Sequence, residues 1–114
     1  ADVMRRRALK PIAAYLEGRN QRDVRLLDIA CGTGRLLGFV SHAWPGMRLS
    51  GLDLSPTYLD YARRHIGASK RLKWTLGAAE RLPFDDASLD IVTAVFLFHE
   101  LPKKVREQVA TQMA

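Results

Sequence analysis

The sequence predicts an α/β fold in which helices pack on a parallel sheet. Stretches with the apolar pattern of strands alternate along the chain with stretches that have the period of helices. This order is typical of parallel strands joined by right-handed helical crossovers. In the segment LLDIACGTGRLLG, residues 26–38, a short apolar run ends in an acidic residue and two glycines. Because ligands of parallel sheets bind at the carboxyl ends of the strands, this segment predicts a ligand site.

The first half of the chain contains two helix–strand pairs. Apolar residues at three- and four-residue steps predict a helix over 3–16, which we expect to kink or begin at Pro11. The next three elements follow from apolar runs, the glycine loop and the Pro45-Gly46 turn: a strand over 24–30, a helix over 35–42 and a strand over 47–54.

The second half continues the alternation. Ser55 and Pro56 predict the start of a helix that runs to about residue 66, because serine caps a helix and proline suits its first turn. A strand over 71–76, a loop over 77–88, an apolar strand over 89–98 and a helix from about 102 follow. No low-complexity tract or linker divides the chain, so we expect a single domain over residues 1–114.

Composition indicates an ordinary globular protein. Apolar residues make up 47% and charged residues 26% of the chain, and no apolar run approaches the roughly 20 residues of a membrane span. We therefore expect a cytoplasmic protein without a membrane span. Cys31 is the single cysteine, which excludes an internal disulfide, and we interpret it as a small buried residue rather than a nucleophile.

The net charge of +6 raises the question of an anionic partner. Eighteen basic residues face 12 acidic ones, but they are scattered, and the one dense run, Arg5 to Arg7, has no interleaved aromatic residue. The sequence therefore favours a solvated basic surface over a nucleic-acid site.

Acidic residues at two strand ends predict a nucleoside ligand. Asp53 lies 19 residues beyond Gly34, a spacing at which a carboxylate accepts hydrogen bonds from both hydroxyls of a ribose. Asp28 precedes the glycine loop. Two structural alternatives remain open: Asp53 is a helix N-terminal charge near Ser55, or Asp28 is an acceptor for N–H groups of the loop.

The ligand is better explained by S-adenosylmethionine than by a dinucleotide. Leu37 occupies the place of the third glycine in the usual dinucleotide fingerprint, and only Gly38 offers a variant. Asp28 would repel a pyrophosphate at the helix N-terminus but would attract a ligand with a positive amino group.

Three segments carry a family resemblance. LLDIACGTGR, GLDLSPTYLDYARRH and GAAERLPFDDASLDIVTAVFLFHEL, in this order, resemble the class I, seven-stranded S-adenosylmethionine-dependent methyltransferases over about residues 24–107. The resemblance is closest to the small-molecule and quinone-type branch, in which an LPF loop precedes the fourth strand. It implies a three-layer αβα, Rossmann-like sheet of order 3-2-1-4-5-7-6, here truncated after the fourth strand and its following helix.

The resemblance also implies roles for individual residues. The methionine part of the cofactor would be held by Asp28, Ala30, Gly32 and Gly34; the ribose by Asp53; and the adenine by Leu54, Ala79 and Glu80; no metal is implied. Family members commonly have an aspartate before the Ala-Glu pair, and this chain has Ala78. Losing that charge-assisted hydrogen bond would weaken cofactor binding by about 1.5 to 3 kcal/mol.

His99 is a weak candidate for a catalytic base, since its position favours a histidine packed at a strand-to-helix corner. We expect methyl transfer to a small-molecule acceptor that the sequence does not identify. A cofactor-binding module without turnover is the alternative, and a nicotinamide-dependent dehydrogenase is disfavoured by Leu37 and Asp28.

The strand over 89–98 is apolar on both faces, as interior strands are. With the order 3-2-1-4, however, it lies at the edge of the sheet, where its outer backbone groups lack partners. We therefore expect this edge to be covered by a further C-terminal segment of a longer protein or by a second copy in a homo-oligomer.

Overall fold

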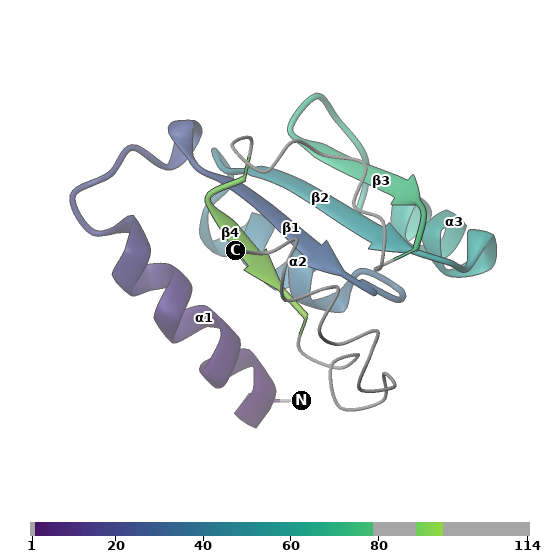
Figure 1. Ribbon diagram of the computed structural model, residues 1–114, viewed down its shortest axis with the longest axis horizontal. Coiled ribbons are helices and arrows are strands. Elements are labelled where there is room, and N and C mark those ends of the chain that lie inside the picture. Colours follow the sequence, from purple (N-terminus) through teal and green to yellow (C-terminus); the bar gives the residue numbers. More distant parts are fainter. Residues whose placement is uncertain (1, 79–88, 95–114) are drawn as a thin grey trace.

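The computed structural model describes residues 2–78 and 89–94, which form a parallel sheet with helices (Figure 1). The strand order is β3-β2-β1-β4, and all three pairings are parallel, which confirms the predicted sheet. The elements are α1 (Asp2–Leu16), the 3-10 turn η1 (Gln21–Asp23), β1 (Arg25–Ile29), α2 (Arg35–Ala43), β2 (Arg48–Asp53), α3 (Pro56–His65), β3 (Leu72–Leu76) and β4 (Ile91–Thr93).

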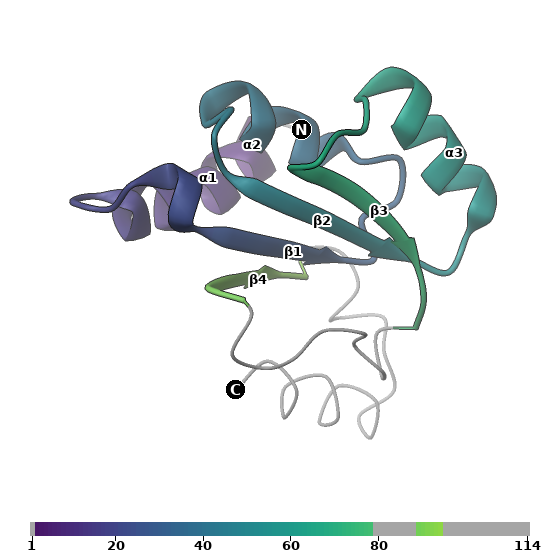
Figure 2. The same cartoon turned by 90° about the horizontal axis from the view of Figure 1, so that it is seen from above.

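The helices α1, α2 and α3 lie on the same face of the sheet (Figure 2). Their buried residues meet alternate residues of the strands in one core, to which the helices contribute Ile12, Leu16, Leu37, Val40, Leu59 and Ala62, and the sheet Leu26, Leu49, Leu72 and Trp74. Side chains of a strand alternate between faces, so Leu27, Ile29 and Leu52 point the other way, and they too are at most 1% exposed. The centre of the sheet is therefore buried on both faces, as in a three-layer fold.

Local sequence signals set the ends of the helices. The Ser55 hydroxyl accepts a hydrogen bond from the Tyr58 N–H at 3.2 Å, and Pro56 is the first residue of α3, as predicted. Gly67 follows with φ +108°, a conformation that favours glycine. Among the helices that the structure describes, none is long and apolar enough to cross a membrane.

Helix α1 differs from one part of its prediction. It begins at Asp2 and runs through Pro11, so the expectation that it begins at the proline is wrong. Proline removes a single hydrogen bond of the helix, whereas Ile12 and Leu16, which follow it, are buried against the sheet. Tertiary packing therefore outweighs the local cost. The 3-10 turn η1 was not predicted; Asn20 caps it by accepting from the Arg22 N–H at 3.0 Å.

The first and fourth strands are shorter than predicted. Ala30 leaves β1 because its φ of +57° is incompatible with an extended strand. Strand β4 covers Ile91–Thr93, and Ala94 does not belong to it; the predicted extension over 95–98 and the helix from 102 lie outside the described residues. Ile91, Val92 and Thr93 are half-buried, because β4 pairs with β1 alone among the described strands and so lies at their edge.

Candidate functional site

The loops that follow β1 and β2 meet at the carboxyl edge of the sheet. The Cys31 N–H donates to the Leu52 carbonyl at 3.0 Å, which continues the parallel pairing of the two strands. One residue further, the Gly32 N–H donates to the Asp53 carboxylate at 2.8 Å. The two segments that the sequence singled out, residues 28–34 and 53–55, therefore form one connected structure.

Both carboxylate oxygens of Asp53 accept hydrogen bonds within this connected structure. Oδ2 accepts the Gly32 N–H, and Oδ1 accepts the Ser55 N–H at 2.9 Å. The contact with Ser55 agrees with the structural alternative, in which Asp53 is a negative charge at the N-terminal end of α3. It does not exclude the ribose role, because each oxygen of a carboxylate has a second lone pair, and the half-buried side chain retains a solvent-accessible side.

Asp28 is the one buried acidic residue in the described part of the chain, at 4% exposure. Its Oδ1 accepts a hydrogen bond from the Thr93 hydroxyl of β4 at 2.7 Å. Burial raises the pKa of Asp28 to about 7; the Thr93 hydrogen bond lowers this pKa and the nearby charge of Asp53 raises it. The carboxyl group therefore changes its charge near neutral pH.

Thr93 is the site residue that the sequence analysis missed. It pairs in register with Asp28 although 65 residues separate them. The available signal was a hydroxyl within the apolar run LDIVTAVFLF, where a buried polar group needs a partner. The sequence leaves open that Asp28 accepts N–H groups of the glycine loop. Among the described contacts, its carboxylate instead accepts the Thr93 hydroxyl of β4.

Gly32 and Gly34 of the loop differ in why a glycine is suited to each position. A Cβ on Gly34 would lie 2.6 Å from the Trp74 ring and 3.1 Å from the Ala62 methyl group, so its absence allows core packing. A Cβ on Gly32 would meet nothing within 4 Å. Both residues have positive φ, +82° and +59°. The open side of Gly32 is therefore the part of the loop that a ligand can approach, whereas the Gly34 N–H already donates to the Cys31 carbonyl.

Cys31 is a packing residue, as predicted. Its side chain is buried, and its sulfur lies where a Cβ on Gly51 would come within 2.8 Å. Burial, together with the nearby charges of Asp28 and Asp53, raises the pKa of the thiol to about 12. A thiol that stays protonated at neutral pH is a poor nucleophile.

Apolar side chains border the carboxylates. Leu54 is 69% exposed directly after Asp53, and Leu76, which pairs with Asp53 across β2 and β3, is 58% exposed. Exposed leucines beside a polar site suit the flat face of an aromatic ligand. Ala78 follows within the described residues, whereas Ala79, Glu80 and His99 lie outside them. The part of the chain that the structure describes contains no group of three or more potential metal ligands.

Comparison with known proteins identifies the family. The methyltransferase domain family matches residues 26–114, and the chain therefore belongs to this family. A demethylmenaquinone methyltransferase of Chlorobaculum tepidum is 36% identical over 103 residues, which are 88% of this chain and 40% of that protein. One of Deinococcus radiodurans is 38% identical over 87 residues, 75% of this chain and 36% of that protein. The chain thus spans about 40% of the length of the curated relatives it matches.

Solved structures share the fold. A protein of echinomycin biosynthesis, associated with conversion of a disulfide bond into a thioacetal group, is 27% identical with a TM-score of 0.71 over 90% of this chain and 41% of its own. A TehB-like S-adenosylmethionine-dependent methyltransferase of Corynebacterium glutamicum, at 22% identity, has a TM-score of 0.65 over 98% of this chain and 65% of its own. Together with the observed strand order, these similarities establish the Rossmann-like fold of class I methyltransferases.

Proposed function

We propose that this chain is the cofactor-binding part of an S-adenosylmethionine-dependent methyltransferase with a small-molecule acceptor of the quinone type. The observation that carries the proposal is the joint position of Asp28 and Asp53 near the carboxyl ends of two adjacent strands, where the Gly32 N–H of the loop after β1 donates to Asp53. Family membership supports the reaction type, and the names of the relatives support the class of acceptor.

The donor set fits the cofactor. Half-buried Asp53 can accept ribose hydroxyls on its remaining lone pairs, and exposed Leu54 offers an apolar surface to adenine. Ionised Asp28 supplies the negative charge that a cationic amino group prefers. The open side of Gly32 leaves room for the methionine part. Ala30, Gly34, Ala79 and Glu80 belong to the proposed binding set through the family resemblance.

Methyl transfer by direct displacement requires little acid–base catalysis from the protein. When bound, S-adenosylmethionine supplies a methyl carbon on a cationic sulfur; an electron pair of the acceptor forms the new bond as the carbon–sulfur bond breaks, and the acceptor releases a proton. The residues described here align and hold the cofactor, which is the larger part of catalysing a displacement. His99 remains the candidate base for the released proton. The proposal includes a cytoplasmic location, which the ordinary globular composition supports.

Calorimetry with S-adenosylhomocysteine and with NAD tests the proposal. We expect saturable 1:1 binding of S-adenosylhomocysteine and none of NAD. Asp53→Ala should weaken the binding by about 2 to 4 kcal/mol, since two charge-assisted hydrogen bonds are lost. Asp60→Ala is the matched control, because within the described residues Asp60 forms only an exposed ion pair with Arg64; the affinity of this variant should not change.

Three outcomes would contradict parts of the proposal. Equal affinity of a folded Asp53→Ala variant and the parent protein would remove Asp53 from the site. Preference for NAD would favour the dehydrogenase alternative. Binding of S-adenosylhomocysteine by the whole protein without methylation of any quinone-type acceptor would favour the module without turnover.

A further inference from the structure

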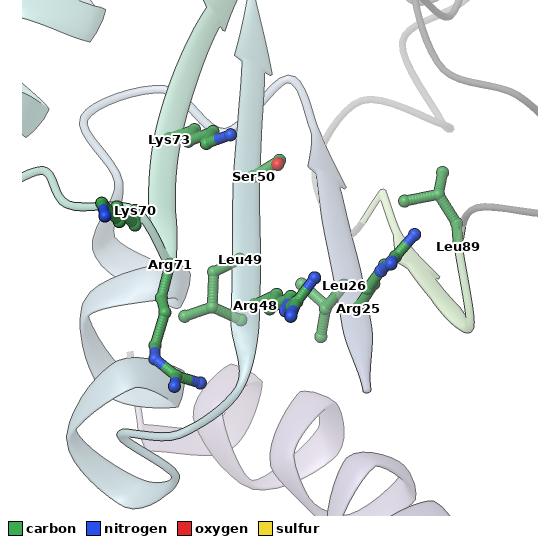
Figure 3. A pocket seen from close by; sticks show the side chains of 9 residues that line it. All are labelled: Arg25, Leu26, Arg48, Leu49, Ser50, Lys70, Arg71, Lys73 and Leu89. Atoms are coloured by element: carbon green, nitrogen blue, oxygen red, sulfur yellow. The ribbon is translucent and has the colours of Figure 1, made fainter. Parts of the chain in front are cut away.

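A hollow lies at the opposite edge of the sheet from Asp53, at the amino ends of β1, β2 and β3 (Figure 3). Its volume is about 330 Å³, at the lower end of the range for small-ligand sites. Its polar lining consists of Arg25, Arg48, Ser50, Lys70, Arg71 and Lys73. The basic residues that looked scattered along the sequence are thus brought together by the fold.

Strand register places two of these cations at paired positions of adjacent strands. Arg25 of β1 pairs with Arg48 of β2, and Ser50 of β2 pairs with Lys73 of β3. In Figure 3, Arg48 extends from β2 toward β1 and Arg25, and Lys73 extends from β3 toward β2 and Ser50. Like charges opposite each other on adjacent strands repel, so this arrangement destabilises the sheet unless an anion lies between them.

Carboxylates in the described residues do not neutralise this cluster. None of its five cations forms an ion pair within that part of the chain; the Arg71 guanidinium donates instead to the Gly46 carbonyl at 2.8 Å. Asp90 is nearby, but its Oδ2 accepts the Arg25 backbone N–H at 2.8 Å rather than the guanidinium. The cluster therefore has hydrogen-bond donors in excess.

We propose that this hollow binds a small anion that carries two or more phosphate groups. Guanidinium groups bind phosphate oxygens with two parallel hydrogen bonds, and a lysine with a neighbouring serine hydroxyl adds donors at the adjacent strand pair. The negative charge would remove the repulsion between neighbouring strands. The hollow lies at the opposite end of the strands from Asp53, so the anion and the cofactor would occupy separate sites.

The lining favours a small anion over a nucleic acid. Single-stranded nucleic acids are held by aromatic side chains on which bases stack, and this hollow has leucines and a serine between its cations but no aromatic residue among its described lining. Its cations surround one concavity and do not continue as a stripe along a helix.

Calorimetry with inorganic tripolyphosphate, at a constant ionic strength of about 150 mM, tests the proposal. We expect 1:1 binding that weakens as salt rises. The double variant Arg48→Gln/Lys73→Gln should weaken it at least about tenfold, since the two central donors are lost. The control Lys10→Gln/Arg64→Gln removes the same charge from exposed positions outside the hollow and should change the affinity less than about threefold.

Absence of saturable binding, or equal weakening in the two double variants, would overturn the proposal, because only non-specific charge would then be involved. Displacement of tripolyphosphate by a single-stranded RNA at a lower phosphate concentration would overturn it in favour of a nucleic acid. Circular dichroism verifies that each variant is folded. The proposal does not depend on the proposed function, since binding of S-adenosylhomocysteine is measured separately and should be equal in all three proteins.

Discussion

At the carboxyl ends of β1 and β2, charged side chains are held by neutral partners, whereas at the amino ends of β1, β2 and β3 several cations line one hollow and two of them occupy paired strand positions. Asp53 accepts two backbone N–H groups, and Asp28 accepts the Thr93 hydroxyl. Arg25 and Arg48 pair across strands without an anion between them among the described residues. The carboxyl edge therefore holds its acidic side chains in place through hydrogen bonds within the protein. At the amino edge, the basic side chains retain free hydrogen-bond donors among the described residues, and like charges repel.

The largest expected effect is on stability, and it distinguishes Gly34, which core packing requires, from Gly32, which faces open space at the same edge. Gly34→Val should lower the free energy of unfolding by about 4 kcal/mol or more, because the new side chain meets Trp74 and the positive φ is strained. Gly32→Val should lower it by only about 1 to 3 kcal/mol, since the strain is similar but the space is open. Denaturant unfolding compares the two variants.

Gly32→Val should also abolish binding of S-adenosylhomocysteine while the protein remains folded, because its side chain occupies the open side of the loop. Full affinity in this variant would show that the loop does not approach the cofactor. Equal stability of the two variants would show that Trp74 does not limit position 34.

Asp28→Asn tests the cost of the buried carboxyl group. Burial raises the pKa of Asp28 from 3.8 to about 7, so the folded state holds this proton more tightly than the unfolded chain. The contribution of Asp28 to stability is therefore most favourable below about pH 4 and is lost as pH rises to about 7. Asn cannot ionise, so at pH 8 the variant should be more stable, by at most about 4 kcal/mol.

The same variant should bind S-adenosylhomocysteine more weakly, because it lacks the charge that attracts the ligand's amino group. In the parent protein, affinity should increase as pH rises through about 7, and in Asp28→Asn this increase should be absent. Thermal unfolding and calorimetry over pH 5 to 9 check both effects. A variant that is less stable at pH 8 would show that the buried charge is better compensated than we infer.

Thr93→Val removes the hydroxyl that donates to Asp28 and keeps the shape of the side chain. We expect a loss of about 1 to 2 kcal/mol in the free energy of unfolding and a further rise in the pKa of Asp28, because ionised Asp28 loses a donor. The pH dependence of cofactor binding should then move to higher pH, and Thr93→Ser should restore it. Thr75→Val on β3 is the control for the same substitution elsewhere in the sheet.

The smallest effect is expected at the amino edge. Arg48→Gln removes one member of the Arg25–Arg48 pair and should raise the free energy of unfolding by a few tenths of a kcal/mol at low salt. The gain should disappear in high salt, which screens exposed charges. Urea unfolding at two salt concentrations measures it. A destabilised Arg48→Gln variant at low salt would mean that this edge bears no repulsion.

The sequence predicted the features that depend on neighbouring residues. Strand and helix periods, the Ser55-Pro56 helix start and the strand order expected from the resemblance are confirmed. Asp53 was predicted to lie at the carboxyl edge of the sheet because strand ends in parallel sheets coincide, and it does lie there. These properties follow from local patterns of burial and capping, which a single sequence displays.

Features that depend on register across the sheet were not predictable in the same way. The Thr93–Asp28 bond requires knowing that the two residues are opposite each other, and the basic hollow requires the alignment of β1, β2 and β3. The role of Gly34 depends on Trp74, 40 residues later. Each of these contacts is set by tertiary pairing, about which local composition carries little information.

The bond between Thr93 and Asp28 also has a consequence for biosynthesis. It joins positions 65 residues apart, so a ribosome must release β4 before the first acidic residue of the site gains its partner. Until then, β1 and β2 can pair, but Asp28 lacks the donor that favours its charged form. A nascent chain should therefore acquire full affinity for its cofactor only when the edge strand docks, which couples the end of synthesis of this region to the start of ligand binding.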